Sequence, residues 1–303
     1  MHLAIVLHPA NPMAAQTAVE FLSLAEKRNL QVHAARRITD AVPSASGYAN
    51  LHLHESEKEA MERGEFTVAI GGDGTILRTA HIARKTQRPL LCINSGKLGF
   101  LANIQRQDLE QAVTEVISGN FNLDRRNFLE AEFSNGEKHF ALNEFVFSRK
   151  GTVSMITLTA EYDGALINRY WADGIIVSSP TGSTAYNLST GGPIVMPQTN
   201  VMVLTPISPH TLTTRPLVLP SHKKLTIKVE PTDQEVLFSG DGNNYELPGT
   251  SPEVHIRQSD NYIELIGLSE HSYFETLRNK LMWGADVREQ KKHDSLYQSK
   301  NKN

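Results

Sequence analysis

The chain has 303 residues, and its 30 lysines and arginines against 33 aspartates and glutamates give a formal charge of −3 at pH 7. A composition of 40% hydrophobic and 21% charged residues is typical of a globular protein with one large domain or two ordinary ones. The charge balance argues against duplex nucleic acid, and Cys92, the one cysteine, excludes an internal disulfide and a cysteine-based metal cluster. The start lacks the features of a signal peptide, and no segment approaches the roughly 20 apolar residues of a membrane span. We therefore expect a soluble, cytoplasmic protein with no nucleic-acid or membrane partner.

Strand and helix patterns alternate through the first part of the chain. Short apolar runs predict strands at residues 3–7, 31–36, 66–70 and 90–93. Amphipathic periods predict helices after Asn11-Pro12, over 56–63 with Ser56 as N-cap, from 76 to about 85, and over 109–117 with Gly119 as the stop. This alternation predicts a Rossmann-like, parallel α/β domain over residues 1–121.

The pattern changes near Asn122, where apolar residues begin to alternate with polar ones. Asn-Gly in residues 134–137 and Asp-Gly in residues 162–164 are typical of tight hairpin turns. Residues 225–229 and 253–256 alternate cleanly, as half-buried strands do. We therefore expect an antiparallel β-sandwich domain over residues 122–270.

A last helix is expected over residues 271–283. Ser272 and Glu275 form a capping-box pattern, and Phe274, Leu277 and Leu281 share one face of the helix that follows. We expect this helix to pack back on the first domain and complete it. Residues 284–303 are polar and are expected to be disordered.

The densest motif is Gly-Gly-Asp-Gly-Thr at residues 71–75, between a buried strand and a helix. Three glycines allow backbone N–H groups to surround an anion, and the helix start adds its own N–H groups, which suits phosphate. Asp73 would then accept a proton from an attacking hydroxyl or help to hold a metal, unless it is only a turn residue. Arg78 lies one helical turn past Thr75 and either reaches the same anion or is simply solvated.

A second loop, over residues 173–193, is rich in glycines and hydroxyls. Hydroxyls both donate and accept hydrogen bonds, so they suit ribose, amide and phosphate groups, and Tyr186 could stack on a base. Asn143 and Glu144 lie within an apolar run, 140–147, that reads as a single strand, and face either solvent or a ligand. Residues 94–101 form another loop after a strand, at the edge of a parallel sheet where ligands bind.

Other signatures are missing. The chain has neither a P-loop nor a Gly-x-Ser-x-Gly elbow, and Leu77 replaces the third glycine of the dinucleotide fingerprint. His52 and His54 would share one strand face, but the sequence offers no third ligand nearby, so we expect no metal site there.

Taken together, the ordered motifs resemble those of the bacterial NAD kinases, also called ATP-NAD kinases. The resemblance extends over residues 3–283 and rests on residues 71–75, 94–101, 143–144, 173–193, 205–212 and 215–217. Gly-Gly-Asp-Gly is shared with lipid kinases, whereas the run at 180–186 followed by Gly-Gly-Pro at 191–193 is specific to this family. Such a resemblance implies transfer of the γ-phosphoryl group of ATP to the 2′-hydroxyl of the adenosine ribose of NAD, which gives NADP.

The resemblance also implies roles for individual residues. Asp73 would be the general base, Gly74 would hold the ligand through its backbone, and Asn143 and Glu144 would engage the adenosine end of NAD. Asp173 would contact a polar group of NAD. The remaining expected ligand contacts are Arg78, Ser154, Thr181, Thr184, Ala185, Tyr186, Asn187, Leu188, Ser189 and Asn243. A divalent ion, expected to be Mg²⁺, would neutralise the phosphates, and the family implies a homo-oligomer, dimer or tetramer.

Three features of the sequence bear on how closely it follows the family pattern, and three alternative functions remain. Ser179 stands where a threonine is common, Trp171 stands where relatives often carry a basic residue, and residues 239–242 are interpreted as a β turn that presents Asn243. A non-catalytic NAD-binding sensor and a lipid kinase are the alternatives, and an NAD-dependent dehydrogenase is a third that the broken fingerprint disfavours.

Overall fold

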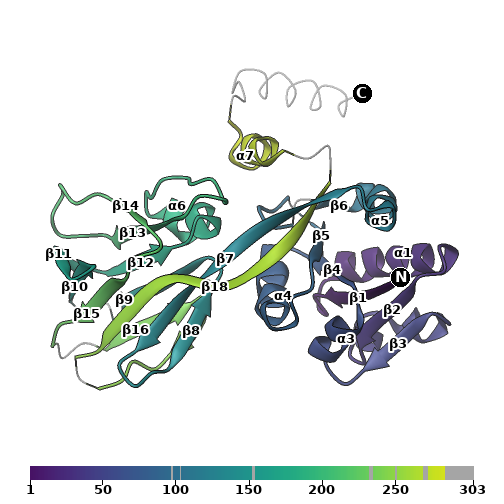
Figure 1. Ribbon diagram of the computed structural model, residues 1–303, viewed down its shortest axis with the longest axis horizontal. Helices are drawn as coiled ribbons and strands as arrows, with labels where there is room; N and C mark the ends of the chain where they lie inside the picture. The colour runs from purple at the N-terminus through teal and green to yellow at the C-terminus, as the bar shows by residue number, and fades with distance from the viewer. Residues whose placement is uncertain are drawn as a thin grey trace, which may run out of the picture.

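The computed structural model describes residues 1–96, 98–102, 104–151, 154–231, 235–249, 251–268 and 272–283. An α/β lobe at one end and a β lobe at the other are joined by a long two-stranded ribbon (Figure 1). The parallel N-terminal sheet and the antiparallel C-terminal strands confirm the expected fold class. The expected disorder of residues 284–303 lies outside the described residues.

Parallel strands and covering helices build the α/β lobe, with strand order β5-β4-β1-β2-β3. The strands are β1 (His2–Leu7), β2 (Gln31–Ala35), β3 (Leu51–His54), β4 (Phe66–Gly71), β5 (Leu90–Asn94) and β6 (Ile104–Gln105). The helices are α1 (Pro12–Lys27), α2 (Ile38–Ala41), α3 (Glu57–Arg63), α4 (Asp73–Thr86) and α5 (Leu109–Ser118), with the 3₁₀ turns η1 (Pro43–Gly47) and η2 (Arg106–Asp108).

Local sequence explains where these helices begin and end. The Asn11 side chain accepts hydrogen bonds from two backbone N–H groups of the first turn of α1, and Ser56 caps α3 through the N–H of Glu59, as predicted. Gly119 ends α5 in the left-handed conformation, with φ of 72°. The sequence predicted that Ile117 lies on the buried face of α5, but its side chain is 40% exposed. The face that α5 packs against the sheet is therefore narrower than predicted.

Each face of the parallel sheet has its own core. Alternate residues of β1 divide between the faces: Leu3, Ile5 and Leu7 pack with Phe21 and Leu22 of α1. On the other face, Ala4 and Val6 pack with Cys92 of β5 and with Ile76 and Ala80 of α4. A strand that is buried on both sides reads as an uninterrupted apolar run, which is why β1 and β4 were recognisable in the sequence.

The β lobe is a sandwich of two sheets. Its elements are β7 (Phe121–Phe133), β8 (Lys138–Ala141), β9 (Glu144–Arg149), β10 (Ile156–Tyr162), β11 (Ala165–Ala172), β12 (Gly174–Ser178), η3 (Thr181–Thr184), α6 (Tyr186–Ser189), β13 (Val201–Ile207), β14 (Leu217–Pro220), β15 (Leu225–Val229), β16 (Val236–Gly240), β17 (Asn243–Tyr245) and β18 (Glu253–Leu268). One sheet has the order β14-β13-β12-β9-β16-β17, and the other continues into the α/β lobe. Phe145, Phe147 and Phe238 are fully buried in the core of the lobe.

Both predicted hairpin turns are present. Gly136 adopts φ of 84° between β7 and β8, and Asp163 and Gly164 adopt φ of 53° and 82° between β10 and β11. Two successive positive φ values match the right-handed twist of the flanking strands, so Asp-Gly is favoured there.

Strand β18 belongs to both lobes. It pairs antiparallel with β7 through a bulge between Gln258 and Tyr262, and it then lies parallel to β5, with Leu265 opposite Leu90. Ile266 and Leu268, near its end, are buried in the α/β core. The ribbon of β7 and β18 is therefore the physical link between the lobes (Figure 1).

The last helix, α7 (Tyr273–Leu281), lies near the top of the ribbon (Figure 1). Ser272 caps it by accepting the N–H of Phe274, and Lys280 reaches the α/β lobe by donating to the carbonyl oxygen of Leu98. Of the predicted apolar face only Leu277 is buried, whereas Phe274 is 55% exposed, because the lobe covers only one narrow side of the helix. No helix in the described part of the chain is both long and apolar enough to cross a membrane.

Candidate active site

Asp73 is the first residue of α4 and lies where β4 ends. The helix begins here rather than at Ile76, because the carbonyl of Gly72 accepts hydrogen bonds from the N–H groups of Thr75 and Ile76. The apolar period starts only at Ile76, so the sequence pattern missed the first turn. An acidic residue in that turn is stabilised by the positive end of the helix dipole.

The carboxylate of Asp73 is held by the loop that follows β5. Oδ2 accepts the N–H of Phe100 at 2.9 Å, and Oδ1 accepts the N–H groups of Leu101 and Ala102, both at 3.0 Å. A carboxylate offers about four lone-pair positions, and these bonds occupy three, which leaves one on Oδ2 for a hydroxyl proton. The side chain is thus oriented before any substrate binds.

Gly99 makes this arrangement possible. A Cβ atom at Gly99 would lie 1.9 Å from Oδ1 of Asp73, so only glycine allows the carboxylate to sit against this loop. The same contacts place residues 99–102 beside Asp73 at the carboxyl end of β4.

Asn143 and Glu144 do not lie within one continuous strand, contrary to the sequence prediction. Strand β8 ends at Ala141 and β9 begins at Glu144, and the two strands belong to different sheets. The chain turns here because three successive N–H groups, those of residues 142–144, donate to the side chain of Asp241. Alternation within an apolar run could not reveal this long-range contact.

The Glu144 side chain is buried, with only 9% exposed. Burial, and after it the neighbouring charge of Asp241, raises the pKa of Glu144 to about 8. Its Oε2 atom has no hydrogen-bond partner within the described residues. A buried carboxyl oxygen without a partner is costly, which indicates a group that a ligand completes.

The hydroxyl-rich loop after β12 lies directly against Asn143. The N–H of Ser179 donates to the carbonyl oxygen of Asn143 at 2.8 Å. A Cβ atom at Gly182 would lie 2.2 Å from the same carbonyl, so this glycine is required by a close backbone approach. The structure thus brings two of the predicted motifs, distant in the sequence, into contact.

The expected ligand contacts in residues 184–189 are not alike. Asn187 is fully buried and its amide is committed to the protein, since it accepts from Thr205 and donates to the carbonyls of Ser183 and Pro193. Tyr186 is partly exposed, and its backbone hydrogen-bonds the Glu144 carboxyl. Thr184, Ala185, Leu188 and Ser189 are also partly or fully exposed. Asn187 therefore holds the loop in its conformation, whereas the side chains of its neighbours face solvent.

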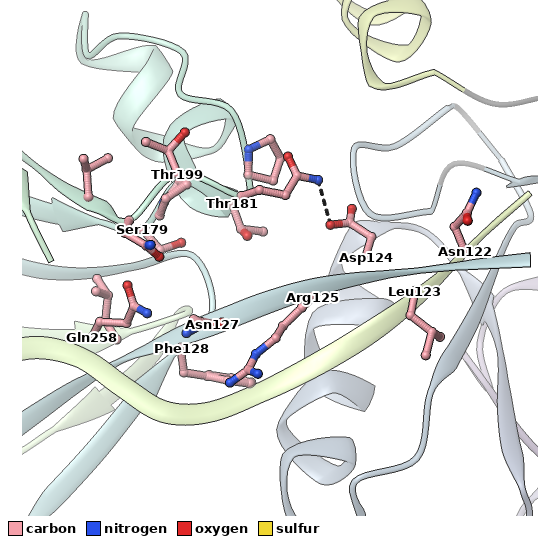
Figure 2. A pocket seen from close by; sticks show the side chains of 16 residues that line it. Asn122, Leu123, Asp124, Arg125, Asn127, Phe128, Ser179, Thr181, Thr199 and Gln258 are labelled. Atoms are coloured by element: carbon pink, nitrogen blue, oxygen red, sulfur yellow. Dashed lines mark hydrogen bonds between the residues drawn. The ribbon is translucent and has the colours of Figure 1, made fainter. Parts of the chain in front are cut away.

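Thr181, in the hydroxyl-rich loop after β12, lines a cavity of about 540 Å³ (Figure 2). Amide and hydroxyl side chains dominate its wall, and Gln198 donates to Asp124 at 2.9 Å across it. Arg126, buried beneath, pairs with Asp124 and donates to Thr181 at 3.5 Å. Neither Asp73 nor Glu144 lines this cavity, so it adjoins the candidate site without containing its acidic groups.

Four other predicted contacts have protein partners or are exposed. The guanidinium of Arg78 is paired with Glu57 of α3, and Asp173 accepts from Arg149. Ser154 is exposed just before β10. Asn243 is exposed, and the predicted turn that presents it is present, with Asp241 and Gly242 at φ of 51° and 79°. The sequence analysis missed Asp241, Arg126 and the N–H groups of residues 100–102, and only the repeated Asp-Gly at 241–242 could have drawn attention to the first.

Comparison with known proteins identifies the family. Residues 3–121 match the ATP-NAD kinase N-terminal domain, and residues 142–268 match the ATP-NAD kinase C-terminal domain. The chain belongs to the ATP-NAD kinase family. It is 40% identical over 236 residues to the NAD kinase of Cytophaga hutchinsonii, a match that covers 77% of this chain and 80% of that protein. It is 37% identical over 281 residues to the NAD kinase of Christiangramia forsetii, covering 91% and 95%.

Solved structures agree with this assignment. Yeast NADH kinase complexed with NADH matches with a TM-score of 0.84 and 26% identity, covering 95% of this chain and 89% of that one. An NAD kinase from Archaeoglobus fulgidus in complex with ATP shares the fold, with a TM-score of 0.70 at 23% identity, covering 92% and 99%. A dehydrogenase is no longer a competing interpretation.

Proposed function

We propose that this chain transfers the γ-phosphoryl group of ATP to the 2′-hydroxyl of the adenosine ribose of NAD, with Asp73 as the general base. Oδ2 of Asp73 takes the hydroxyl proton, the ribose oxygen bonds to the γ-phosphorus, and the bond from that phosphorus to the β–γ bridging oxygen breaks to release ADP. One observation carries the proposal. Asp73, at the N-terminus of α4, is oriented by the backbone N–H groups of residues 100–102.

The acceptor ribose is proposed to lie between Asp73 and the segment of Asn143 and Glu144. Glu144 supports this role because it is buried, has a raised pKa and carries an oxygen without a partner in the described structure. With a pKa of about 8 it is mostly protonated at neutral pH, so it can donate one hydrogen bond and accept others. A ribose hydroxyl or the edge of an adenine base would both accept a hydrogen bond from the Glu144 carboxyl and donate one to it.

We propose Mg²⁺ as the divalent ion, and it enters with the donor as Mg-ATP. The described residues hold no group of three or more His, Cys, Asp or Glu side chains that could hold a metal. Mg²⁺ commonly keeps several waters and binds through substrate phosphates, so a resident protein site is not required. The ion supplies charge neutralisation at the phosphates.

Formation of NADP from NAD and Mg-ATP by the purified protein tests the proposed reaction. An NADP-specific dehydrogenase reads the product, and we expect turnover that depends on both substrates. NAD binding without any NADP formation would instead support a non-catalytic sensor, and phosphorylation of diacylglycerol or a sphingoid base would support a lipid kinase.

A homo-oligomer is proposed because the expected NAD contacts are split between two ends of β12. Asp173 precedes this five-residue strand and the Thr181 loop follows it, so they lie about 17 Å apart. Exposed apolar side chains lie on the two sheet edges β11 and β14 and in the loop before β14: Leu166, Trp171, Leu212, Leu217 and Val218. We propose that a second copy buries these side chains and brings its own Asp173 near the Thr181 loop of the first copy.

Complementation between two inactive variants tests this sharing. We expect Asp73→Asn and Asp173→Asn each to lose activity, and a tagged heterodimer of the two to regain it, since one of its two sites has both native residues. Homodimers of each variant, purified in the same way, are the controls. A heterodimer as inactive as its parents would show that Asp73 and Asp173 act within a single chain.

Two further expectations stay proposals. We propose the cytoplasm as the location, supported by the single, buried Cys92, which suits a reducing compartment. We also propose residues 1–121 as the nucleotide-binding unit, completed by the helix expected at 271–283, and residues 122–270 as the NAD-binding unit.

A further inference from the structure

The turn between β16 and β17 does more than present Asn243, because it buries a carboxylate. The Asp241 side chain is only 1% exposed. Its Oδ1 accepts the N–H groups of Asn143 at 2.8 Å and Glu144 at 3.3 Å, and its Oδ2 accepts the N–H of Leu142 at 2.6 Å. The N–H of Asp241 donates in return to the carbonyl oxygen of Glu144 at 3.1 Å.

The fourth partner of this carboxylate comes from the other lobe. Nε2 of His81 lies 2.7 Å from Oδ2 of Asp241, and because a carboxylate only accepts, Nε2 is the donor. With four donors, the lone-pair positions of Asp241 are filled. The carboxylate therefore has no capacity left for a ligand, and its role concerns the protein itself.

His81 is on the same helix as Asp73. The two residues are eight positions apart on α4, about 12 Å along its axis. Around His81 the helix packs on the β lobe, since the imidazole lies edge-on to Phe128 at 5.4 Å and the Arg84 guanidinium covers Phe140 at 3.9 Å. One carboxylate thus connects the helix of the base to the segment of Asn143 and Glu144.

We propose that Asp241 and His81 are positioning residues for phosphoryl transfer. Asp241 fixes the backbone of residues 142–144, and His81 fixes that segment at a set distance from Asp73. The inference rests on the proposed function, because it concerns the alignment of the acceptor hydroxyl with its base. Neither residue contacts the substrate.

His81 acts through Asp241, whereas Asp241 also holds residues 142–144 directly, so their substitutions differ in kinetics. Asp241→Asn replaces an acceptor oxygen by an amide that faces donors, so the 142–144 segment loosens, and we expect a rise in KM for NAD with a fall in kcat/KM of about 10²-fold. His81→Ala leaves the segment held by Asp241 but frees it from α4, so we expect kcat to fall with KM for NAD little changed. His81→Gln, whose amide can still donate to Asp241, should restore most of kcat.

Arg84→Leu is the matched control, because it alters the same helix face without touching Asp241. We expect it to lower the melting temperature and to leave kcat and KM near wild type. In a double-mutant cycle, His81→Ala should add little in the Asp241→Asn background. If His81→Ala lowers only the melting temperature, as Arg84→Leu does, or if the two effects simply add, the positioning role is wrong.

Calorimetric titration with NAD distinguishes failure of this inference from failure of the proposed function. Absence of NADP formation by the wild-type protein would overturn the function. The titration would still test Asp241, since weaker NAD binding by Asp241→Asn than by Arg84→Leu supports its hold on residues 142–144. Equal affinity in the wild type and in a folded Asp241→Asn variant would overturn it.

Discussion

Replacing Asp73 by asparagine should lower kcat for NADP formation by about 10²–10⁴-fold, the usual effect of removing a general base. The asparagine oxygen can keep the bonds from Leu101 and Ala102, whereas the amide nitrogen would face the N–H of Phe100. We therefore expect a folded protein with one weakened loop contact. Steady-state kinetics with Mg-ATP and NAD, together with the melting temperature, check this result.

The Michaelis constants separate loss of the base from loosening of the loop. Loss of the base alone leaves KM for NAD close to wild type, whereas a displaced loop raises KM. A folded Asp73→Asn variant that turns over at the wild-type rate would remove Asp73 from the mechanism.

Gly99→Ala should reduce kcat by about 10²-fold although residue 99 performs no chemistry. The new Cβ would stand 1.9 Å from Oδ1 of Asp73 and 2.6 Å from its Cγ, so the carboxylate must leave its three N–H donors. Gly99 does not have a positive φ, so alanine itself fits the backbone, and we expect only a small fall in melting temperature. Kinetics and thermal unfolding of the purified variant provide the check.

Gly96→Ala is the control for this substitution. It lies in the same loop, its added Cβ would meet nothing within 4 Å, and its φ is not positive. We expect its kcat to match the wild type. Equal activity of the Gly99→Ala and Gly96→Ala variants would mean that Asp73 need not stay where the loop holds it.

Local patterns predicted the elements well where burial has one simple period. Strands buried on both faces, such as β4, appear in the sequence as apolar runs. The pair Asp163-Gly164 predicts a turn because both residue types tolerate the positive φ that the turn has. Glycine-rich stretches were harder, since residues 71–74 resemble a loop although α4 already begins at Asp73. The spacing of apolar residues shows which face of a helix is buried, but it does not show where the first turn begins.

Candidate site residues could be proposed one by one from the sequence, but their tertiary contacts could not. Asp73, Asn143 and Glu144 could be singled out from type and context. Their partners are far away in the sequence: Asp73 binds residues 100–102, and residues 142–144 bind Asp241. Arg78 is a similar case, because its pairing with Glu57 of α3 could not be foreseen from its place near the phosphate loop. Contacts of this kind depend on tertiary structure and leave no periodic signal.

The path of β18 also determines the order in which the chain can fold as it leaves the ribosome. Strand β18 ends at Leu268 of 303 residues, yet Ile266 and Leu268 fill the core beside β1 and its partner helices. Until these residues are synthesised, the part of the β5 edge around Leu90 lacks its neighbour and the first core remains open. The N-terminal lobe therefore depends on nearly the last part of the chain, and translation stopped at residue 121 would release an unfinished sheet with an exposed edge.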